Sequence, residues 1–131
     1  MLIDTSGFLC FLDKRDFRHQ RAAEYFMSAR SRPTHNYVLA ELVALAESRN
    51  YSREITLNFL SDILEDSETE IIWATENLTE RAINFLRKRK DKEWSLCDAV
   101  SFLLMKEHGI SEALTTDHHF EQAGYVQLLE S

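Results

Sequence analysis

The sequence predicts a single α/β domain, a three-layer α/β/α sandwich with a central parallel sheet that spans residues 1–131. Three observations support this prediction. The chain has 131 residues, a length that one hydrophobic core can organise. Short apolar runs alternate with longer segments whose apolar residues repeat at helical spacing. Only three glycines and one proline are present, so tight turns are few and a sandwich of short strands is disfavoured.

The first segment predicts a strand, a polar turn and two helices. Leu2-Ile3 is a short apolar run, and residues 7–12 begin a helical stretch for which Ser6 is the expected N-cap. Residues 17–29 carry apolar side chains at helical spacing. The Arg-Ser-Arg-Pro segment at 30–33 ends this helix, because proline lacks the N–H that a helix interior needs.

The middle of the chain predicts three more helices and two more strands. A brief extended piece at 34–36 precedes residues 37–46, which are apolar nearly all round. Ser52 is the expected N-cap of an amphipathic helix that continues to residue 64. The β-branched and aromatic residues 70–74 predict a buried strand.

The next helix is expected to begin at Asn77, because Glu80 follows three residues later, and to run through residue 86. A largely buried helix over 95–105 is expected to end near Gly109, a typical residue at the end of a helix. Residues 113–116 then predict a strand, a short helical turn follows, and 125–129 form the last strand.

Composition and charge exclude several classes of protein. The net charge of −7 argues against bulk attraction to nucleic acid, although a site built of carboxylates contributes negative charge and bound cations reverse its sign locally. No apolar run is long enough to cross a bilayer, and no signal peptide is recognised, so a soluble, cytoplasmic protein with no membrane partner is expected. Cys10 and Cys97 lie in apolar surroundings and are expected to be free core thiols.

Four acidic residues interrupt apolar segments or follow predicted strand ends: Asp4, Glu41, Asp98 and Asp117. Strands separated by helices imply a parallel sheet, and ligands bind beyond the carboxyl ends of such strands. An isolated buried carboxylate is costly unless it is paired or binds a cation. The four side chains are therefore predicted to converge and to bind a divalent cation. Oxygen ligands favour Mg²⁺ or Mn²⁺, whereas zinc is usually bound by histidine and cysteine.

Each acidic residue also has a structural interpretation. Asp4 and Asp117 could cap the helices that follow them, and Glu41 could lie half exposed at a helix start. Asp98 has the strongest alternative, because Ser95-x-x-Asp98 resembles a capping box in which the acid accepts from the serine N–H. The joint occurrence at expected strand ends favours one shared site.

The acidic segments closely resemble, in order and over essentially the whole chain, the motifs of PIN-domain nucleases, especially VapC-like toxins. The segments are Ile3-Asp4-Thr5-Ser6, Leu39-Ala40-Glu41-Leu42, Ser95-Leu96-Cys97-Asp98-Ala99 and Thr115-Thr116-Asp117-x-x-Phe120. Each motif is weak alone, but the set with its spacings is specific. The resemblance implies an α/β/α fold, RNA cleavage that depends on Mg²⁺ or Mn²⁺, and an antitoxin partner; a homodimer is also expected. It matches the acidic residues to the family's catalytic positions, and Ser6 and Thr116 to hydroxyl positions that support the site.

Candidate RNA-binding residues lie before the Asp98 motif. Arg87, Lys88 and Arg89 concentrate positive charge next to Trp94, whose indole is a candidate platform for a base. An equally good interpretation is a solvated helix end, where cations complement the helix dipole. His119 is a candidate substrate contact, although adjacent histidines on a helix point in different directions and are more often surface residues.

Two other functional classes share features of this sequence. A haloacid-dehalogenase-like phosphatase also has an aspartate after its first strand but needs a second acid two residues later, where this chain has Ser6. A non-catalytic RNA- or protein-binding module of the same fold is the stronger alternative, and the complete set of acidic motifs favours the enzyme over it.

Overall fold

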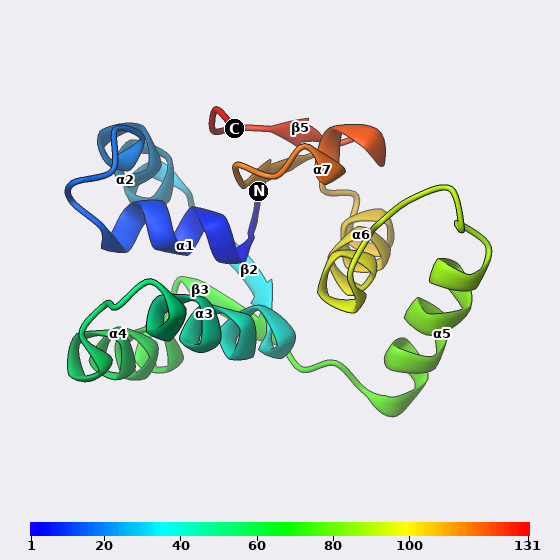
Figure 1. The fold of residues 1–131 in the computed structure, drawn as a ribbon, viewed down its shortest axis with the longest axis horizontal. Coiled ribbons are helices and arrows are strands. Elements are labelled where there is room, and N and C mark those ends of the chain that lie inside the picture. The colour runs from blue at the N-terminus through cyan, green and yellow to red at the C-terminus, as the bar shows by residue number, and fades with distance from the viewer.

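The computed structural model describes residues 1–131 and contains the five strands and seven helices that the sequence predicts. Figure 1 shows helices α1–α4 on one side, α5 and α6 on the other, and the N-terminus between them. In chain order the elements are β1 (Leu2–Ile3), α1 (Thr5–Leu12), α2 (His19–Ser28), β2 (Arg32–His35), α3 (Asn36–Ser48), α4 (Arg53–Glu65), β3 (Thr69–Ile72), α5 (Glu76–Arg87), α6 (Leu96–His108), β4 (Glu112–Leu114), α7 (His119–Gln122) and β5 (Val126–Gln127).

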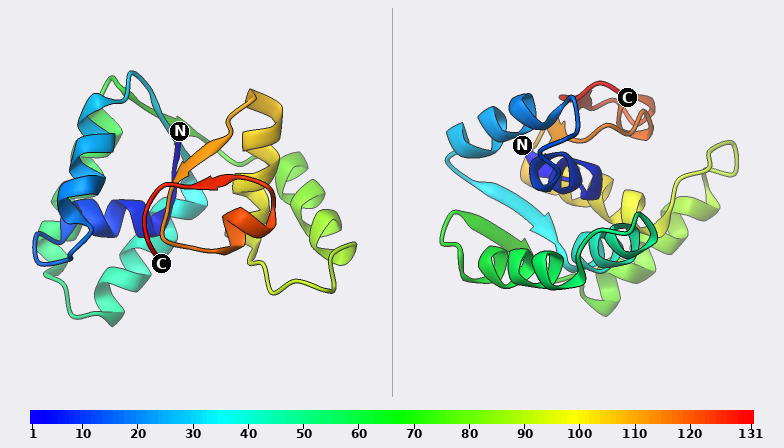
Figure 2. Two further views of the ribbon diagram at one scale, coloured as in Figure 1. Left: turned by 90° about the horizontal axis from the view of Figure 1, so that it is seen from above. Right: turned by 60° about the vertical axis from the view of Figure 1, so that its left-hand side comes forward.

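All strand pairs are parallel, as the alternation of strands and helices predicts. One ladder has the order β1-β4-β5, and a second joins β2 to β3. Strands β1 and β2 lie side by side without a ladder between them, and the Thr34 hydroxyl donates to the Ile3 carbonyl at 2.9 Å. In Figure 2 the short β1 segment at the N-terminus lies next to β4, drawn in orange. The predicted parallel sheet is confirmed. Its hydrogen bonds form two separate ladders, β1-β4-β5 and β2-β3.

The residues of β1 and β4 alternate between two cores. Ile3 and Leu114 pack with buried side chains of α1–α4, whereas Leu2 and Ala113 pack with α6, α7 and Trp94. A third cluster lies between α5 and α6. Successive side chains of a strand point to opposite faces, so this alternation is what a sheet covered on both faces requires. The three-layer sandwich is thereby confirmed.

Two predicted helix starts are wrong by one or two residues. The first helix begins at Thr5 after an extended Asp4, and the Ser6 hydroxyl donates to Asp4 at 3.2 Å instead of capping. The helix expected from Asn77 has Thr75 as its cap, which accepts the Leu78 N–H at 3.1 Å. Both segments contain several residue types that can cap, and the local φ and ψ angles decide which of them does. The Ser52 cap is confirmed.

The strand predicted at 70–74 is present but is not buried as expected. It is β3, which pairs only with β2, and Glu70 and Trp73 are exposed. A strand with one neighbour has an open side, which allows the charged side chain of Glu70 to reach water. Cys10 and Cys97 are buried free thiols, as predicted. None of the helices combines the length and the apolar character needed to cross a membrane.

Candidate active site

Two of the four acidic residues follow neighbouring strands. Asp4 comes directly after β1, and Asp117 lies three residues beyond the last residue of β4. Because β1 and β4 are parallel, their carboxyl ends lie at the same edge of the sheet. Glu41 from α3 and Asp98 from α6 complete the cluster, because the charges of both raise the pKa of Asp4. The structure therefore places the four predicted acids in one region, where their charges act on one another, but no three of their carboxylates lie within 4.8 Å of one another.

Asp4 is the most deeply buried member of the cluster, with 5% of its surface exposed. Its Oδ2 accepts hydrogen bonds from the Thr115 hydroxyl at 2.8 Å and from the Ser6 hydroxyl at 3.2 Å. Burial raises the pKa of Asp4 from 3.8 to about 7; the Thr115 hydrogen bond opposes this shift, and the charge of Asp98 adds to it. No arginine or lysine forms an ion pair with Asp4, so its negative charge has hydroxyl partners and no cation.

Asp98 both closes a capping box and faces the cluster. Its Oδ2 accepts the Ser95 N–H at 3.1 Å while the Ser95 hydroxyl accepts the Asp98 N–H at 3.0 Å, so the alternative interpretation of this motif is confirmed as a structural role. The same Oδ2 lies 3.1 Å from Nδ1 of His119. Burial raises the pKa of Asp98, and the nearby charge of Asp117 raises it further. Capping therefore does not remove Asp98 from the cluster.

Glu41 is half buried, and its carboxylate lies next to the buried thiol of Cys97. Burial raises the pKa of Cys97 strongly, and the charges of Glu41 and Asp4 add to this effect. The thiolate is the form that binds metals, so a buried thiol with a raised pKa is a weaker candidate ligand than the carboxylates beside it.

A short network of hydroxyl groups connects the two strand ends. The Ser6 and Thr115 hydroxyls lie 3.0 Å apart, and the Thr116 N–H donates to the Ser6 hydroxyl at 2.9 Å. Ser6 therefore contacts the cluster, whereas Thr116 contributes its backbone. The hydroxyl that contacts Asp4 after this strand belongs to Thr115, which the sequence motifs did not assign to the site. The available signal was its position two residues before Asp117 and next to Thr116.

The basic segment before α6 is only partly available to RNA. Arg87 and Lys88 are exposed, but Arg89 is paired with Asp91 and lies over the Trp94 ring, 4.8 Å from its centroid. The expectation that Trp94 stacks on a base is wrong. Only 6% of this residue is exposed, its ring stacks on Phe85 at 5.7 Å, and its Nε1 donates to Gln122 at 3.0 Å. Packing between α5, α6 and α7 uses the indole as a core side chain.

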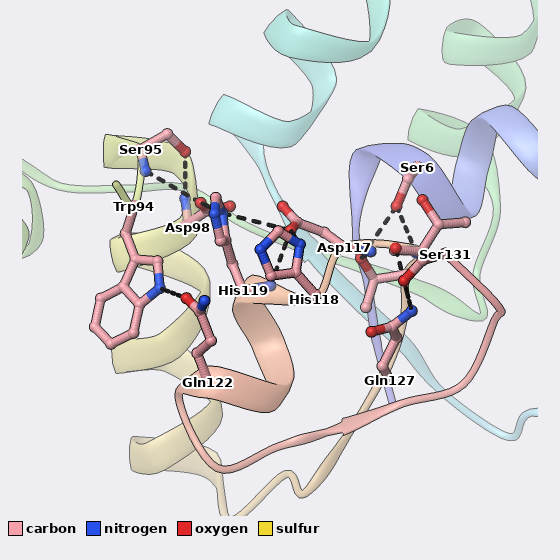
Figure 3. A network of polar contacts seen from close by, with 12 residues as sticks. Ser6, Trp94, Ser95, Asp98, Asp117, His118, His119, Gln122, Gln127 and Ser131 are labelled. Carbon is pink, nitrogen blue, oxygen red and sulfur yellow. Dashed lines mark hydrogen bonds and ion pairs between the residues drawn. The ribbon is translucent and has the colours of Figure 1, made fainter. Parts of the chain in front are cut away.

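The cluster has the properties of a site for hard divalent cations. Carboxylates from four parts of the chain lie in one region, burial and neighbouring acidic charges raise the pKa of Asp4 and Asp98, and no arginine or lysine forms an ion pair with any of the four. Crowded carboxylates of this kind are stabilised by Mg²⁺ or Mn²⁺, which take oxygen ligands. His119 is the nearest nitrogen donor, between Asp98 and Asp117 (Figure 3).

Known proteins share the sequence pattern and the fold of this chain. The family profile described as "PIN domain" matches residues 1–125. The 23S rRNA-specific endonuclease VapC20 of Mycobacterium tuberculosis, from two strains, is 29% identical over 132 residues, which cover 98% of this chain and 97% of that protein. The crystal structure of Mycobacterium tuberculosis VapC20, described as a sarcin-ricin loop cleaving toxin, superposes with a TM-score of 0.87 and 29% identity over 96% of each chain.

Proposed function

Since this chain belongs to the PIN-domain family, we propose that it is a metal-dependent endoribonuclease and the toxin of a toxin–antitoxin pair. The observation that carries this proposal is the placement of Asp4, Glu41, Asp98 and Asp117 near one sheet edge, with no arginine or lysine paired to any of them. The similarity to VapC20 over nearly the full length of both chains supports ribosomal RNA as the substrate, within a structured loop. The proposal includes a homodimer and a cognate antitoxin that supplies positive charge to the acidic cluster.

The protein's own part of the mechanism is to hold oxygen ligands in fixed positions. The Thr115 and Ser6 hydroxyls orient the Asp4 carboxylate, and the capping box fixes Asp98 at the first turn of α6. Without cations the cluster repels an RNA phosphate. Divalent cations bound by the four carboxylates would activate a water molecule and stabilise charge on the attacking and leaving oxygens. The acids interact closely enough to share protons, so we assign general-base capacity to the cluster.

The direct test is RNA cleavage with and without divalent metal. Purified protein incubated with labelled ribosomal RNA fragments and Mg²⁺ or Mn²⁺ is expected to cut them at a defined position, and excess EDTA is expected to stop cleavage because the carboxylates alone repel the phosphate. An Asp4→Asn preparation made in parallel controls for contaminating nuclease. Robust cleavage by the wild type in EDTA would contradict metal dependence. Binding of RNA without cleavage under any metal condition would favour the non-catalytic module.

Two substitutions distinguish the role of Asp98 as a helix cap from its proposed role as a metal ligand. Asp98→Asn keeps an oxygen that can accept the Ser95 N–H, and it relieves repulsion, so the metal-free variant should be at least as stable as the wild type. The wild type should gain about 2.7 kcal/mol of stability at Mn²⁺ 100-fold above Kd, and the variant distinctly less. The control Ser95→Ala removes the cap and should lose about 1 kcal/mol with or without metal. Melting curves across a Mn²⁺ titration measure both, and an equal gain in Asp98→Asn would exclude Asp98 as a ligand.

The exposed basic residues at the end of α5 are expected to contact RNA phosphates. The double variant Arg87→Ala/Lys88→Ala should bind RNA more weakly, and the slope of log affinity against log salt should fall by up to about 0.7 per lost contact on single strands. Fluorescence anisotropy with labelled RNA in EDTA measures this without cleavage. Arg53→Ala on α4, across the molecule from α5 (Figure 1), is the matched control. A salt slope unchanged from the wild type would make Arg87 and Lys88 ordinary surface residues.

A further inference from the structure

Asp117, His118 and His119 form a group of mixed nitrogen and oxygen donors beside the acidic cluster, which we call the His–Asp group. Figure 3 shows the two imidazoles next to each other, with the Asp117 carboxylate reaching toward them. One potential ligand atom from each residue lies within 4.8 Å of the other two. No other part of the chain brings three such side chains together.

The geometry of the two histidines differs from the expectation that adjacent residues of a helix diverge. Their ring centroids lie 4.6 Å apart. Helix α7 has four residues and starts directly after the turn at Asp117, whose Oδ1 accepts the His119 N–H at 2.9 Å. The Asp117 N–H in turn donates to the Thr115 hydroxyl at 3.0 Å, which fixes this turn against the strand end. The backbone thus holds both imidazoles on the side of Asp117.

The separations between the donor atoms match those of ligands on one small ion. The Asp117 Oδ1 lies 3.4 Å from Nδ1 of His119 and 3.7 Å from Nδ1 of His118. Nitrogen and oxygen ligands at about 2.1 Å from a tetrahedral ion are about 3.4 Å apart. Neither pair forms a direct hydrogen bond, and both separations are compatible with ligands on one ion.

We propose that the His–Asp group binds a borderline divalent ion such as Zn²⁺ or Co²⁺. Imidazole nitrogens with one carboxylate favour such ions, whereas the all-oxygen part of the cluster favours Mg²⁺. The side chains of His118, Asp117 and His119 are 64%, 31% and 21% exposed, so an ion reaches them from solvent. This binding needs no RNA and no turnover, and it goes beyond the proposed nuclease activity.

Binding at this position competes with an existing contact. Nδ1 of His119 lies 3.1 Å from Oδ2 of Asp98. An ion that takes Nδ1 would break this contact and free an Asp98 oxygen. The His–Asp group therefore lies next to the acidic cluster: Asp117 belongs to both, and His119 contacts Asp98.

The test uses Co²⁺ as a spectroscopic probe and Zn²⁺ by calorimetry, both on the intact protein without RNA. The wild type should show a ligand-field spectrum typical of nitrogen and oxygen ligands. His118→Gln should weaken Co²⁺ and Zn²⁺ binding by at least about tenfold, because even partners outside the first coordination shell cost about 10- to 100-fold when removed. His118→Gln/His119→Gln should abolish the spectrum, and His108→Gln, at an exposed histidine at the end of α6, should leave it unchanged.

Two outcomes overturn the proposal. One is a Co²⁺ spectrum and Zn²⁺ affinity that are the same in the wild type and the double histidine variant. The other is the absence of any nitrogen-ligated spectrum in the wild type. Because His118 is largely exposed, its substitution does not endanger folding, and a thermal melt of each variant checks this. Asp4→Asn separates this site from the proposed function, since it should lose RNA cleavage but keep the spectrum.

Discussion

Replacing Asp4 by asparagine is expected to lower RNA cleavage by at least about 100-fold, the upper range seen when only an outer-shell partner of a metal site is lost. Asparagine keeps the size of the side chain and can still accept from Thr115 and Ser6. The change therefore removes the charge and little else. Cleavage rates measured at saturating Mg²⁺ report the loss.

The same variant is expected to change how stability depends on pH. Burial raises the pKa of Asp4 in the folded protein to about 7, above its unfolded value of 3.8. The folded state therefore binds the proton more tightly, and the stability from this group is fully present below about pH 4 and is lost as pH rises to about 7. The loss is up to about 4 kcal/mol, at about 1.4 kcal/mol for each pH unit between the two pKa values.

This measurement requires a comparison between variants, because His35 acts in the opposite sense. Burial lowers the pKa of His35 from 6.5 to about 4, so its contribution is lost as pH falls through that interval. The free energy of unfolding of the metal-free wild type minus that of Asp4→Asn, measured at each pH, isolates the Asp4 contribution. Asp62→Asn on the exposed face of α4 is the control. A difference that is flat between pH 4 and 7 would show that Asp4 is ionised in the metal-free protein at all these pH values.

Gly7→Ala is expected to cause the largest loss of stability among the three Gly→Ala substitutions. A Cβ at this position would overlap the Leu114 carbonyl oxygen and lie 2.9 Å from its carbonyl carbon. Both are backbone atoms of β4, so α1 must move away from the strand. Overpacking of this kind costs about 1–3 kcal/mol and at times more, which exceeds the roughly 1 kcal/mol that alanine gains over glycine in a helix.

The control for this prediction is Gly109→Ala. Gly109 has a φ of +65° and no atom within 4 Å of its Cβ position, so alanine there costs only about 1–2 kcal/mol of backbone strain. Denaturant unfolding of both variants distinguishes the cost of steric overlap at position 7 from the cost of backbone strain at position 109. Because α1 carries Ser6 and follows Asp4, Gly7→Ala should also lower cleavage, whereas Gly109→Ala should not. Equal cleavage by Gly7→Ala and the wild type would mean that α1 can shift without moving the site.

The order of the elements and the identity of the acidic residues could be predicted from the sequence. Apolar spacing is a local property, so each helix and strand follows from about ten consecutive residues. Asp4 and Asp117 could be assigned to one sheet edge, because parallel strands separated by helices place their carboxyl ends together. The motifs around Glu41 and Asp98 were identifiable because a charge in an apolar helix needs a partner.

Contacts between residues far apart in the chain could be determined only from the tertiary structure. Thr115 reaches Asp4 because β1 and β4 pair in one register, and a shift of one residue would turn its hydroxyl away. Trp94 is a core residue because Phe85 and Phe102 meet it from α5 and α6, although its neighbours in sequence are basic. The amino-acid sequence thus determined which chemical groups this protein carries and on which elements, and long-range packing determined which of them meet, because register and helix approach depend on the whole core at once.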